Sequence, residues 1–205
     1  MTEVKPPALV LAGGKSLRMG AAKAWLPFGN GTLLTHILRR LGPQVSEVAL
    51  NATPVIPSPS DIRIVADTLP GQRGPLAGIL AGLRDISKRN LATHLLTVPS
   101  DAPFLPEDLA PRLVAGATDG KIAVAASGGQ SHPVFALWPV FLADNIEAWL
   151  ADPDHRQLGD FLTSHQVVCV EWPIEETTIG PFDPFMNINT PSDLEEARRF
   201  LEIRP

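Results

Sequence analysis

Short apolar runs alternate with helical patterns along the first half of the chain. Residues 8–11, 48–50, 62–66 and 95–98 are β-type runs without polar alternation, which is typical of strands covered on both faces. Strands separated by helical segments indicate right-handed β-α-β units. We therefore expect an α/β fold with a mostly parallel open sheet and helices on both faces, as in Rossmann-like domains.

Helices are expected between these strands. Apolar residues recur at i, i+3, i+4 and i+7 within residues 34–41, and Thr32 is a residue type that caps helices. Further helices are expected over residues 75–85 and 106–117. Pro111 should shorten or interrupt the second of these, because proline disturbs a helix interior.

The second half of the chain is less regular, although its last helix is clearly signalled. Thr190 is a capping residue, Pro191 takes the first helical position, and Asp193 stands where a capping box closes. The other elements expected here are strands at 122–126, 131–137 and 167–171 and a helix at 142–150.

Composition limits the classes of protein to consider. With 205 residues, of which 44% are hydrophobic, the chain suits one self-supporting domain. Its formal net charge of -5 argues against a general nucleic-acid binder, which needs a broad basic face. A local basic cluster could still hold a small anion.

The sequence contains neither a membrane-spanning window nor a signal-peptide pattern, and it has a single cysteine. No window approaches the length of a membrane span, and the first seven residues lack the apolar region of a signal peptide. Cys169 is the only cysteine, which excludes a disulfide framework, and its apolar strand predicts a core position. We expect a cytoplasmic protein that binds neither membrane nor nucleic acid.

A glycine-rich loop follows the first expected strand. Residues 11–23 read LAGGKSLRMGAAK and carry Lys15, Arg18 and Lys23 with no acidic residue among them. Open α/β sheets bind ligands at the carboxyl ends of their strands, and backbone N–H groups with cations suit a polyphosphate. The spacing fits neither a P-loop nor G-x-G-x-x-G. From these features alone, an ordinary turn with solvated cations stays an alternative.

The same segment resembles the signature L-A-x-G-x-S-x-R-M-G-x-x-K of nucleotidyltransferases with a glycosyltransferase-A-like fold. With Gly13 after Ala12 it is similar to the molybdenum-cofactor guanylyltransferases, whereas cytidylyl-transferring relatives more often carry Ala there. The match continues through residues 24–29, AWLPFG. One departure is Ala22, because family members commonly have Asp before the lysine.

Two further loops resemble elements of this family. Residues 67–79 (DTLPGQRGPLAGI) resemble D-x-x-P-G-x-x-G-P-L-A-G-I, and Arg73 adds charge before a helix amino terminus that favours anions. Residues 98–105 (VPSDAPFL) resemble V-P-x-D-x-P-F-L, with Ser100 where members often have Cys. The single carboxylate of Asp101 suits magnesium, which keeps several waters and borrows phosphate oxygens.

Two segments of the second half also match. Residues 185–191 (FMNINTP) resemble F-x-N-I-N-T-P, and on an extended segment the alternating Asn187 and Asn189 would face one side. Residues 131–136 (SHPVFA) fit the family as a substrate-side strand. We expect His132 within that strand to be packed or hydrogen-bonded rather than catalytic.

The resemblance implies roles for individual residues. Asn51 and Asp67, which end strands, would lie near the base and ribose, although Asn and Asp also serve as ordinary turn residues. The implied catalytic residues are Arg18, Lys23 and Asp101, with magnesium on Asp101. The implied nucleotide-binding residues are Leu11, Ala12, Gly13, Gly14, Lys23, Asn51, Asp67 and Asp101. The implied residues for the pterin substrate are Arg73, Asn187 and Asn189.

The implied activity is a magnesium-dependent transfer of GMP from GTP to the phosphate of the molybdenum–molybdopterin cofactor, with release of pyrophosphate. One nucleotidyltransferase domain would span residues 1–205, with a nucleotide-binding half at about 1–110 and a pterin half at about 111–205. Implied partners are GTP, the molybdenum cofactor, cofactor-insertion proteins and molybdoenzyme chaperones. The alternatives are a cytidylyltransferase on the same cofactor, a nucleotidyltransferase for sugar phosphates, and a nonenzymatic GTP-binding regulator.

Overall fold

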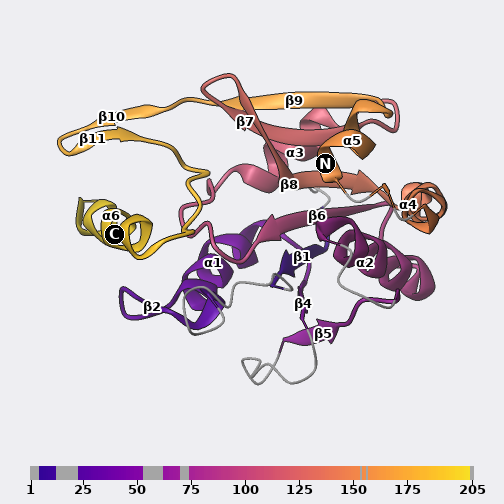
Figure 1. Cartoon of the computed structure of the whole chain (residues 1–205), viewed down its shortest axis with the longest axis horizontal. Coiled ribbons are helices and arrows are strands. Elements are labelled where there is room, and N and C mark those ends of the chain that lie inside the picture. Colours follow the sequence, from indigo (N-terminus) through magenta and orange to yellow (C-terminus); the bar gives the residue numbers. More distant parts are fainter. Residues whose placement is uncertain are drawn as a thin grey trace.

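The central element of the molecule is a seven-stranded sheet (Figure 1). The computed structural model describes residues 5–12, 23–52, 62–69, 74–152, 154–155 and 157–203. The strands of the sheet are β1 (Ala8–Leu11), β4 (Val48–Asn51), β5 (Arg63–Val65), β6 (His94–Pro99), β7 (Ile122–Ser127), β8 (Gln130–Pro139) and β9 (Val167–Trp172). Their spatial order is β5-β4-β1-β6-β8-β7-β9.

Neighbouring strands of this sheet are parallel except where β8 pairs with β6 and with β7. Strand β8 follows β7 through a tight turn at Gly128 and Gly129, which both have positive φ. Such a turn reverses the chain, whereas each parallel pair is reached through a longer connection. The expected mostly parallel α/β sheet is confirmed.

Helices cover both faces of the sheet. The described helices are α1 (Leu33–Leu41), α2 (Pro75–Arg89), α3 (Leu109–Gly116), α4 (Ala143–Ala151), α5 (Leu158–Thr163) and α6 (Pro191–Ile203), of which all but α6 lie on the faces of the sheet. Helices α1 and α3 pack on the face that holds Val10, and α2, α4 and α5 pack on the face that holds Leu9. These adjacent residues of β1 face opposite ways because side chains alternate along a strand.

A third apolar cluster lies beside the sheet, where α6 packs near the start of α1. It includes Phe28 of the hairpin β2 (Pro27–Phe28) and β3 (Gly31–Thr32), and Phe182 of the hairpin β10 (Glu175–Thr177) and β11 (Gly180–Phe182). The cluster therefore joins the amino-terminal and carboxyl-terminal parts of the chain. Three 3-10 turns complete the described elements: η2 (Lys23–Trp25), η3 (Gly42–Gln44) and η4 (Val140–Leu142).

The predicted helix caps are present. Thr32 accepts a hydrogen bond from the Thr35 backbone N–H at 3.2 Å, and the Thr35 hydroxyl accepts one from the Thr32 N–H at 2.8 Å. At α6, Asp193 accepts from the Thr190 N–H at 2.9 Å and donates its own N–H to the Thr190 hydroxyl at 3.2 Å. Each capping box satisfies backbone N–H groups that the helix leaves unpaired.

Several expectations about local structure were wrong. Helix α3 is shorter than the predicted range 106–117, as expected from Pro111, but it is not interrupted: it begins at Leu109, and Pro111 lies in its first turn, where a missing N–H costs nothing. Helix α2 runs on to Arg89, beyond the predicted end at residue 85. Cys169 is exposed rather than in the core, because β9 is an edge strand with one side turned outward. None of the described helices is both long enough and apolar enough to cross a membrane.

Candidate active site

The carboxyl ends of β1, β4 and β6 meet at one edge of the sheet. The Ala12 N–H donates to the Asn51 carbonyl at 2.9 Å, and the Ser100 N–H donates to the Leu11 carbonyl at 3.2 Å. These bonds bring the start of the glycine-rich loop beside the end of β4 and beside the segment that carries Asp101. Residues that the sequence assigned to the nucleotide thus converge from distant parts of the chain.

Lys23 lies at the centre of this edge. Its ammonium Nζ is 3.3 Å from Asp101 Oδ2 and donates to Asn189 Oδ1 at 2.8 Å. The three residues are far apart in sequence, with separations of 78 and 166 positions from Lys23. One cation therefore contacts both the predicted metal ligand and a residue predicted to bind the pterin.

The Asp101 carboxylate is only partly compensated. Desolvation by burial raises its pKa, and although the charge and hydrogen bond of Lys23 act against this, the pKa stays above its ordinary value. Lys23 is the one cation that the described residues bring to it. A partly dehydrated carboxylate with a single ammonium partner has capacity to hold a further cation.

A cation at this position would depend on Asp101. Within the described ranges, no group of three or more His, Cys, Asp and Glu side chains could hold a metal ion. Magnesium fits such a site because it needs few protein ligands and takes its remaining oxygens from phosphates and water. The residues present are therefore compatible with the magnesium ion expected from the sequence.

The segment of residues 183–189 reaches this edge from the carboxyl-terminal side. The Ile188 N–H donates to the Asp101 carbonyl at 2.8 Å. Ile188 is fully buried, whereas Asn187 and Asn189 on either side of it are exposed. Both asparagines are thus exposed on either side of a buried residue, which agrees with the predicted alternation.

The position of Asn189 is fixed by the capping box of α6. Its backbone N–H donates to Asp193 Oδ2 at 2.7 Å. Burial acts to raise the pKa of Asp193, but hydrogen bonds from Asn189 and Thr190 and the charge of Lys23 hold it below its ordinary value. Asp193 is therefore ionised at neutral pH and keeps the backbone of Asn189 in place.

Asn51 and Asp67 form a pair at the neighbouring part of the edge. The Asn51 Nδ2 donates one hydrogen to the Val65 carbonyl and the other to Asp67 Oδ1, each at 2.9 Å. Asn51 is only 5% exposed, whereas Asp67 is exposed. Since both N–H groups of the Asn51 amide are used, Asn51 orients Asp67, and Asp67 is the more accessible of the two to a ligand.

A glycine that the sequence reading did not single out makes room for this pair. A Cβ atom on Gly78 of α2 would lie 2.4 Å from Asn51 Oδ1 and 2.9 Å from a methyl carbon of Leu11. Only a residue without a side chain lets the helix approach the amide so closely. The signal was present in the sequence, because Gly78 belongs to the P-L-A-G-I part of the family element.

Other predicted site residues lie outside the described residues. They are Gly13, Gly14, Arg18 and Arg73, and with them Lys15 and Ala22 of the glycine-rich loop. Leu11 and Ala12 are described and half-buried at the end of β1. The roles of the first group stay predictions from the sequence.

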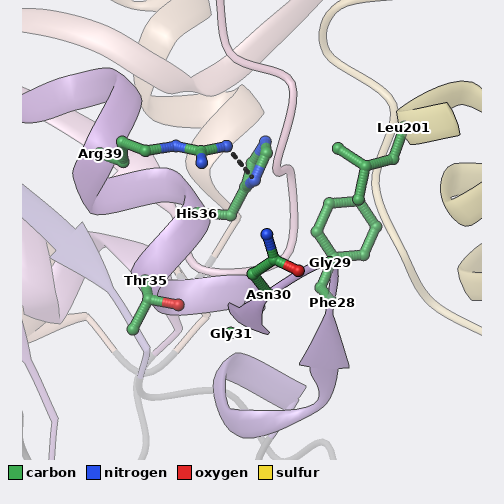
Figure 2. A pocket seen from close by; sticks show the side chains of 8 residues that line it. All are labelled: Phe28, Gly29, Asn30, Gly31, Thr35, His36, Arg39 and Leu201. Atoms are coloured by element: carbon green, nitrogen blue, oxygen red, sulfur yellow. Dashed lines mark hydrogen bonds between the residues drawn. The ribbon is translucent and has the colours of Figure 1, made fainter. Parts of the chain in front are cut away.

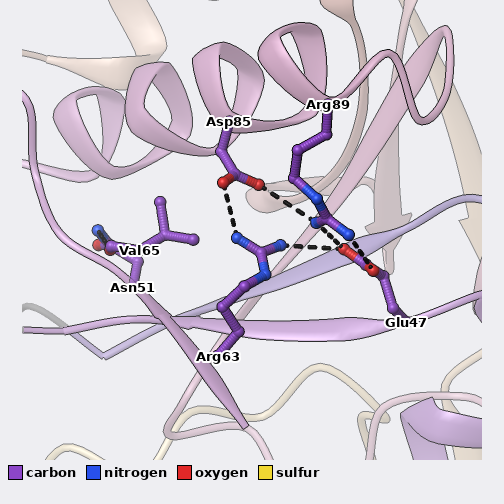
Figure 3. A network of polar contacts seen from close by, with 6 residues as sticks. All are labelled: Glu47, Asn51, Arg63, Val65, Asp85 and Arg89. Atoms are coloured by element: carbon purple, nitrogen blue, oxygen red, sulfur yellow. Dashed lines mark hydrogen bonds and ion pairs between the residues drawn. The ribbon is translucent and has the colours of Figure 1, made fainter.

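A second polar network lies at the other end of β4 (Figure 3). Arg63 contacts Glu47 at 2.9 Å and Asp85 at 2.7 Å, and Arg89 of α2 contacts the same two carboxylates. The hydrogen bond from Arg89 is the main reason that the pKa of Glu47 lies below its ordinary value. Asn51 lies at the opposite end of the strand in the same view. This network is therefore not part of the edge formed by the carboxyl ends of β1, β4 and β6, which we call the ligand edge.

A cavity of about 420 Å³ opens between α1, the β2–β3 hairpin and α6 (Figure 2). Its lining residues are Phe28, Gly29, Asn30, Gly31, Thr35, His36, Arg39 and Leu201. Arg39 donates to His36 Nδ1 at 3.0 Å, and burial together with the nearby Arg39 and Arg40 charges lowers the pKa of His36 to about 4. Among the described residues, none that the sequence assigned to catalysis or binding lines this cavity.

Comparison with known proteins finds a family model and relatives that match most of the chain. Residues 8–168 match the family model described as the MobA-like NTP transferase domain. A protein of Rhizobium meliloti (strain 1021) named molybdenum cofactor guanylyltransferase is 49% identical over 200 residues, which cover 96% of this chain and 92% of that protein.

Solved structures show the same fold at low identity. Molybdopterin-guanine dinucleotide biosynthesis protein A from Archaeoglobus fulgidus superimposes with a TM-score of 0.75 at 22% identity, covering 96% of this chain and 99% of that one. The 2-C-methyl-D-erythritol 4-phosphate cytidylyltransferase of Thermus thermophilus gives 0.67 at 19% identity, covering 97% and 99%. The expected fold of glycosyltransferase-A-like nucleotidyltransferases is confirmed.

Proposed function

Because the chain belongs to the MobA-like NTP transferase family, we propose that it is a molybdenum cofactor guanylyltransferase. It transfers GMP from GTP to the phosphate of the molybdenum–molybdopterin cofactor, releases pyrophosphate, and forms the guanine dinucleotide form of the cofactor. Relatives of 47–49% identity that match nearly the whole chain bear the name molybdenum cofactor guanylyltransferase, which supports the choice of both substrates.

The contact of Lys23 with Asp101 and Asn189 is the observation that carries this proposal. Transfer between two phosphates requires that two anions be held next to each other and in line. An ammonium that touches residues of both expected subsites lies where the two anions would meet. Its charge would reduce their repulsion and stabilise the charge that develops on the phosphates.

The nucleotide side of the proposed site is the edge formed by β1, β4 and β6. Asp67, held by Asn51, faces outward there and would bind the ribose or base of GTP. The backbone at residues 11–14 would read the guanine edge, and Arg18 would join Lys23 on the triphosphate. On the acceptor side, Asn187, Asn189 and Arg73 would orient the pterin substrate.

Asp101 would hold magnesium in this proposal. When bound, the ion would neutralise part of the phosphate charge. Lys23 would neutralise a further part from its position beside the carboxylate, and the Asp101 carbonyl would keep the segment of Asn187 and Asn189 in register through Ile188. The raised pKa of Asp101 fits a carboxylate whose preferred partner is a cation.

The two substrates would bind to different halves of the single domain. GTP would bind to the half at about residues 1–110, and the pterin to the half at about residues 111–205. The product would pass in the cytoplasm to cofactor-insertion proteins and molybdoenzyme chaperones.

The experiment that tests the activity is release of pyrophosphate from GTP in the presence of magnesium and the molybdenum cofactor. We expect release only when both substrates are present, and a strong preference for GTP over CTP and ATP. Equal kcat/KM for GTP and CTP would favour the alternative of a cytidylyltransferase acting on the same cofactor. Binding of GTP without release of pyrophosphate would favour a regulator.

A further inference from the structure

A buried hydroxyl group joins β7 and β8 to the segment that carries the two asparagines. Ser127 ends β7 and is 3% exposed. Its hydroxyl Oγ donates to Asp183 Oδ1 at 2.9 Å and lies 2.7 Å from His132 Nε2. The same Asp183 oxygen accepts the Phe185 N–H at 2.8 Å. We call residues 183–189 the acceptor loop, since it carries Asn187 and Asn189.

Strand β8 is irregular in a way that turns His132 toward this loop. Val124 pairs with Ala136, and the next residue of β7, Ala125, pairs with His132, so one step on β7 corresponds to four on β8. Ala136 packs on the face of α2, whereas the His132 ring stacks on Phe185 with centroids 4.7 Å apart and planes 25° apart. Bulges of this kind re-aim side chains, often beside active sites.

The hydrogen-bond network assigns the proton on the histidine. A carboxylate can only accept, and the Ser127 hydroxyl has one hydrogen, which it donates to Asp183. The remaining contact therefore requires His132 Nε2 to donate to the Ser127 oxygen. Desolvation lowers the pKa of His132 despite the charges of Asp183 and Glu171, so the ring is neutral at pH 7 and carries its hydrogen on Nε2.

This network fixes one end of the acceptor loop, and Asp101 fixes the other. Asp183 and Phe185 form a tight turn at the start of the loop, and the Ile188 N–H bonds to the Asp101 carbonyl near its end. Together with the bond of the Asn189 N–H to Asp193, these two attachments hold the backbone that presents the side chains of Asn187 and Asn189. His132 supports the first attachment twice, by its donor to Ser127 and by its stacking on Phe185.

We propose that His132, with Ser127 and Asp183, is a positioning residue for the second substrate, because together they hold the acceptor loop against the sheet. The inference rests on the function proposed above only for the identity of that substrate. His132 acts through the loop and does not transfer a proton to the substrate, since its one N–H is committed to Ser127.

Hydrogen exchange measures the order of the loop without any catalytic reaction. In His132→Leu and Ser127→Ala, we expect the amides of residues 185–189 to exchange about tenfold faster, as expected for loss of about one hydrogen bond. His132→Gln should restore slow exchange, because the glutamine amide can donate to Ser127. Amides of β1 and β6 should be unchanged in all three variants.

Kinetics test the consequence for the substrates. His132→Leu should raise the KM for the molybdenum cofactor about tenfold, and leave the Kd for GTP within twofold of the wild-type value. His94→Leu is the matched control, because His94 is also half-buried with a lowered pKa but begins β6 at the opposite end of the sheet. It should change neither the loop amides nor the KM.

Three results would overturn the inference. Exchange that rises evenly over the whole chain, with a matching fall in Tm, would show that His132 only supports the core. A raised KM with unchanged loop exchange would mean that His132 contacts the substrate itself. If neither the loop exchange nor the KM changed, His132 would have no role in positioning the second substrate. If the wild type transferred no GMP while the loop exchange responded as expected, the function would fail and the role of His132 in ordering the loop would stand.

Discussion

Strand β4 connects two polar networks that differ in how completely their charges are paired. Next to its start, Glu47 and Asp85 each contact both Arg63 and Arg89, so two carboxylates and two guanidinium groups compensate one another (Figure 3). The ligand edge lies at the other end of β4. There, Lys23 is the one described cation that contacts Asp101, and burial raises the pKa of the Asp101 carboxyl group.

The difference is the one expected between a structural network and the proposed ligand site. The closed network ties α2 to the edge strand β5, and each of its four charged groups already contacts two groups of opposite charge. The ligand edge holds a carboxylate, a shared ammonium and exposed amides, which can all gain partners when substrates bind. Groups with perturbed pKa values and incomplete pairing are typical of functional sites.

Removing the carboxylate at the ligand edge should have the largest effect. Asp101→Asn keeps the shape of the side chain but removes the charge that would hold magnesium, and we expect turnover to fall by roughly 10³-fold with the fold intact. Asp85→Asn, in the closed network, should keep full activity. A near wild-type rate for Asp101→Asn at low magnesium would remove Asp101 from its proposed role.

Removing the ammonium of Lys23, which contacts both Asp101 and Asn189, should have the second largest effect on activity. Lys23→Ala should lower the rate by roughly 10²–10³-fold, about 3–4 kcal/mol, and weaken GTP binding measured by calorimetry. Arg89→Ala removes a cation of the closed network and should leave both unchanged. If the two variants lost activity to a similar degree, the contrast between the two ends of β4 would be lost.

Two glycines of α2 give a finer test. Gly78→Ala places a methyl group against the Asn51 amide and should displace Asp67, which would weaken GTP binding by about tenfold, the effect of about one hydrogen bond. Gly82→Ala would instead meet methyl carbons of Leu9 and Leu95. It should lower the Tm and leave the Kd for GTP unchanged; equal Kd values for the two variants would contradict the role of Asn51.

Asn189→Ala should have a smaller effect that is divided between the substrates. From the sequence, this change would raise the KM for the pterin and leave GTP affinity nearly unchanged. Because Asn189 accepts from Lys23, we now also expect a weaker Kd for GTP, by about 0.5–1.5 kcal/mol. Calorimetry with GTP alone checks this, and an unchanged Kd would show that Lys23 holds its position without Asn189.

The smallest effect is expected in the closed network. Glu47→Gln should lower the free energy of unfolding by about 0.5–1 kcal/mol in urea at pH 7, with activity unchanged. Since the pKa of Glu47 is lowered in the folded state, its contribution is present above the ordinary carboxyl pKa and disappears as the pH falls through the folded value. Wild type and variant should therefore have equal stability in strong acid, and a difference that persists there would exclude Glu47 ionisation as its source.

Local patterns in the sequence were enough for much of the fold. The apolar runs located β1 and β6, and the capping residues Thr32 and Thr190 located the first turns of α1 and α6. The spacing of the asparagines around Ile188 correctly predicted which residues face outward. These features depend on neighbours within a few residues, which the sequence displays directly.

Features that depend on distant contacts could not be predicted in this way. Periodicity placed β8 but not the irregular register that turns His132 toward Phe185. The burial of Asn51 depends on a glycine of another element, Gly78. Helix α5 and the two hairpins are too short for a periodic pattern, and they are stabilised by what they pack against.

The distance in sequence between Lys23 and Asn189, 166 positions, has a consequence for synthesis of the protein. Domains generally fold as units while the chain emerges from the ribosome. Here the partner of the lysine, and the Asp193 cap that holds it, are among the later residues to be translated. A nascent chain could form β1, β4 and β6 and still lack the acceptor side. The ammonium of Lys23 would therefore gain its contact with Asn189 only after the residues that form β1, β4 and β6 have all been synthesised.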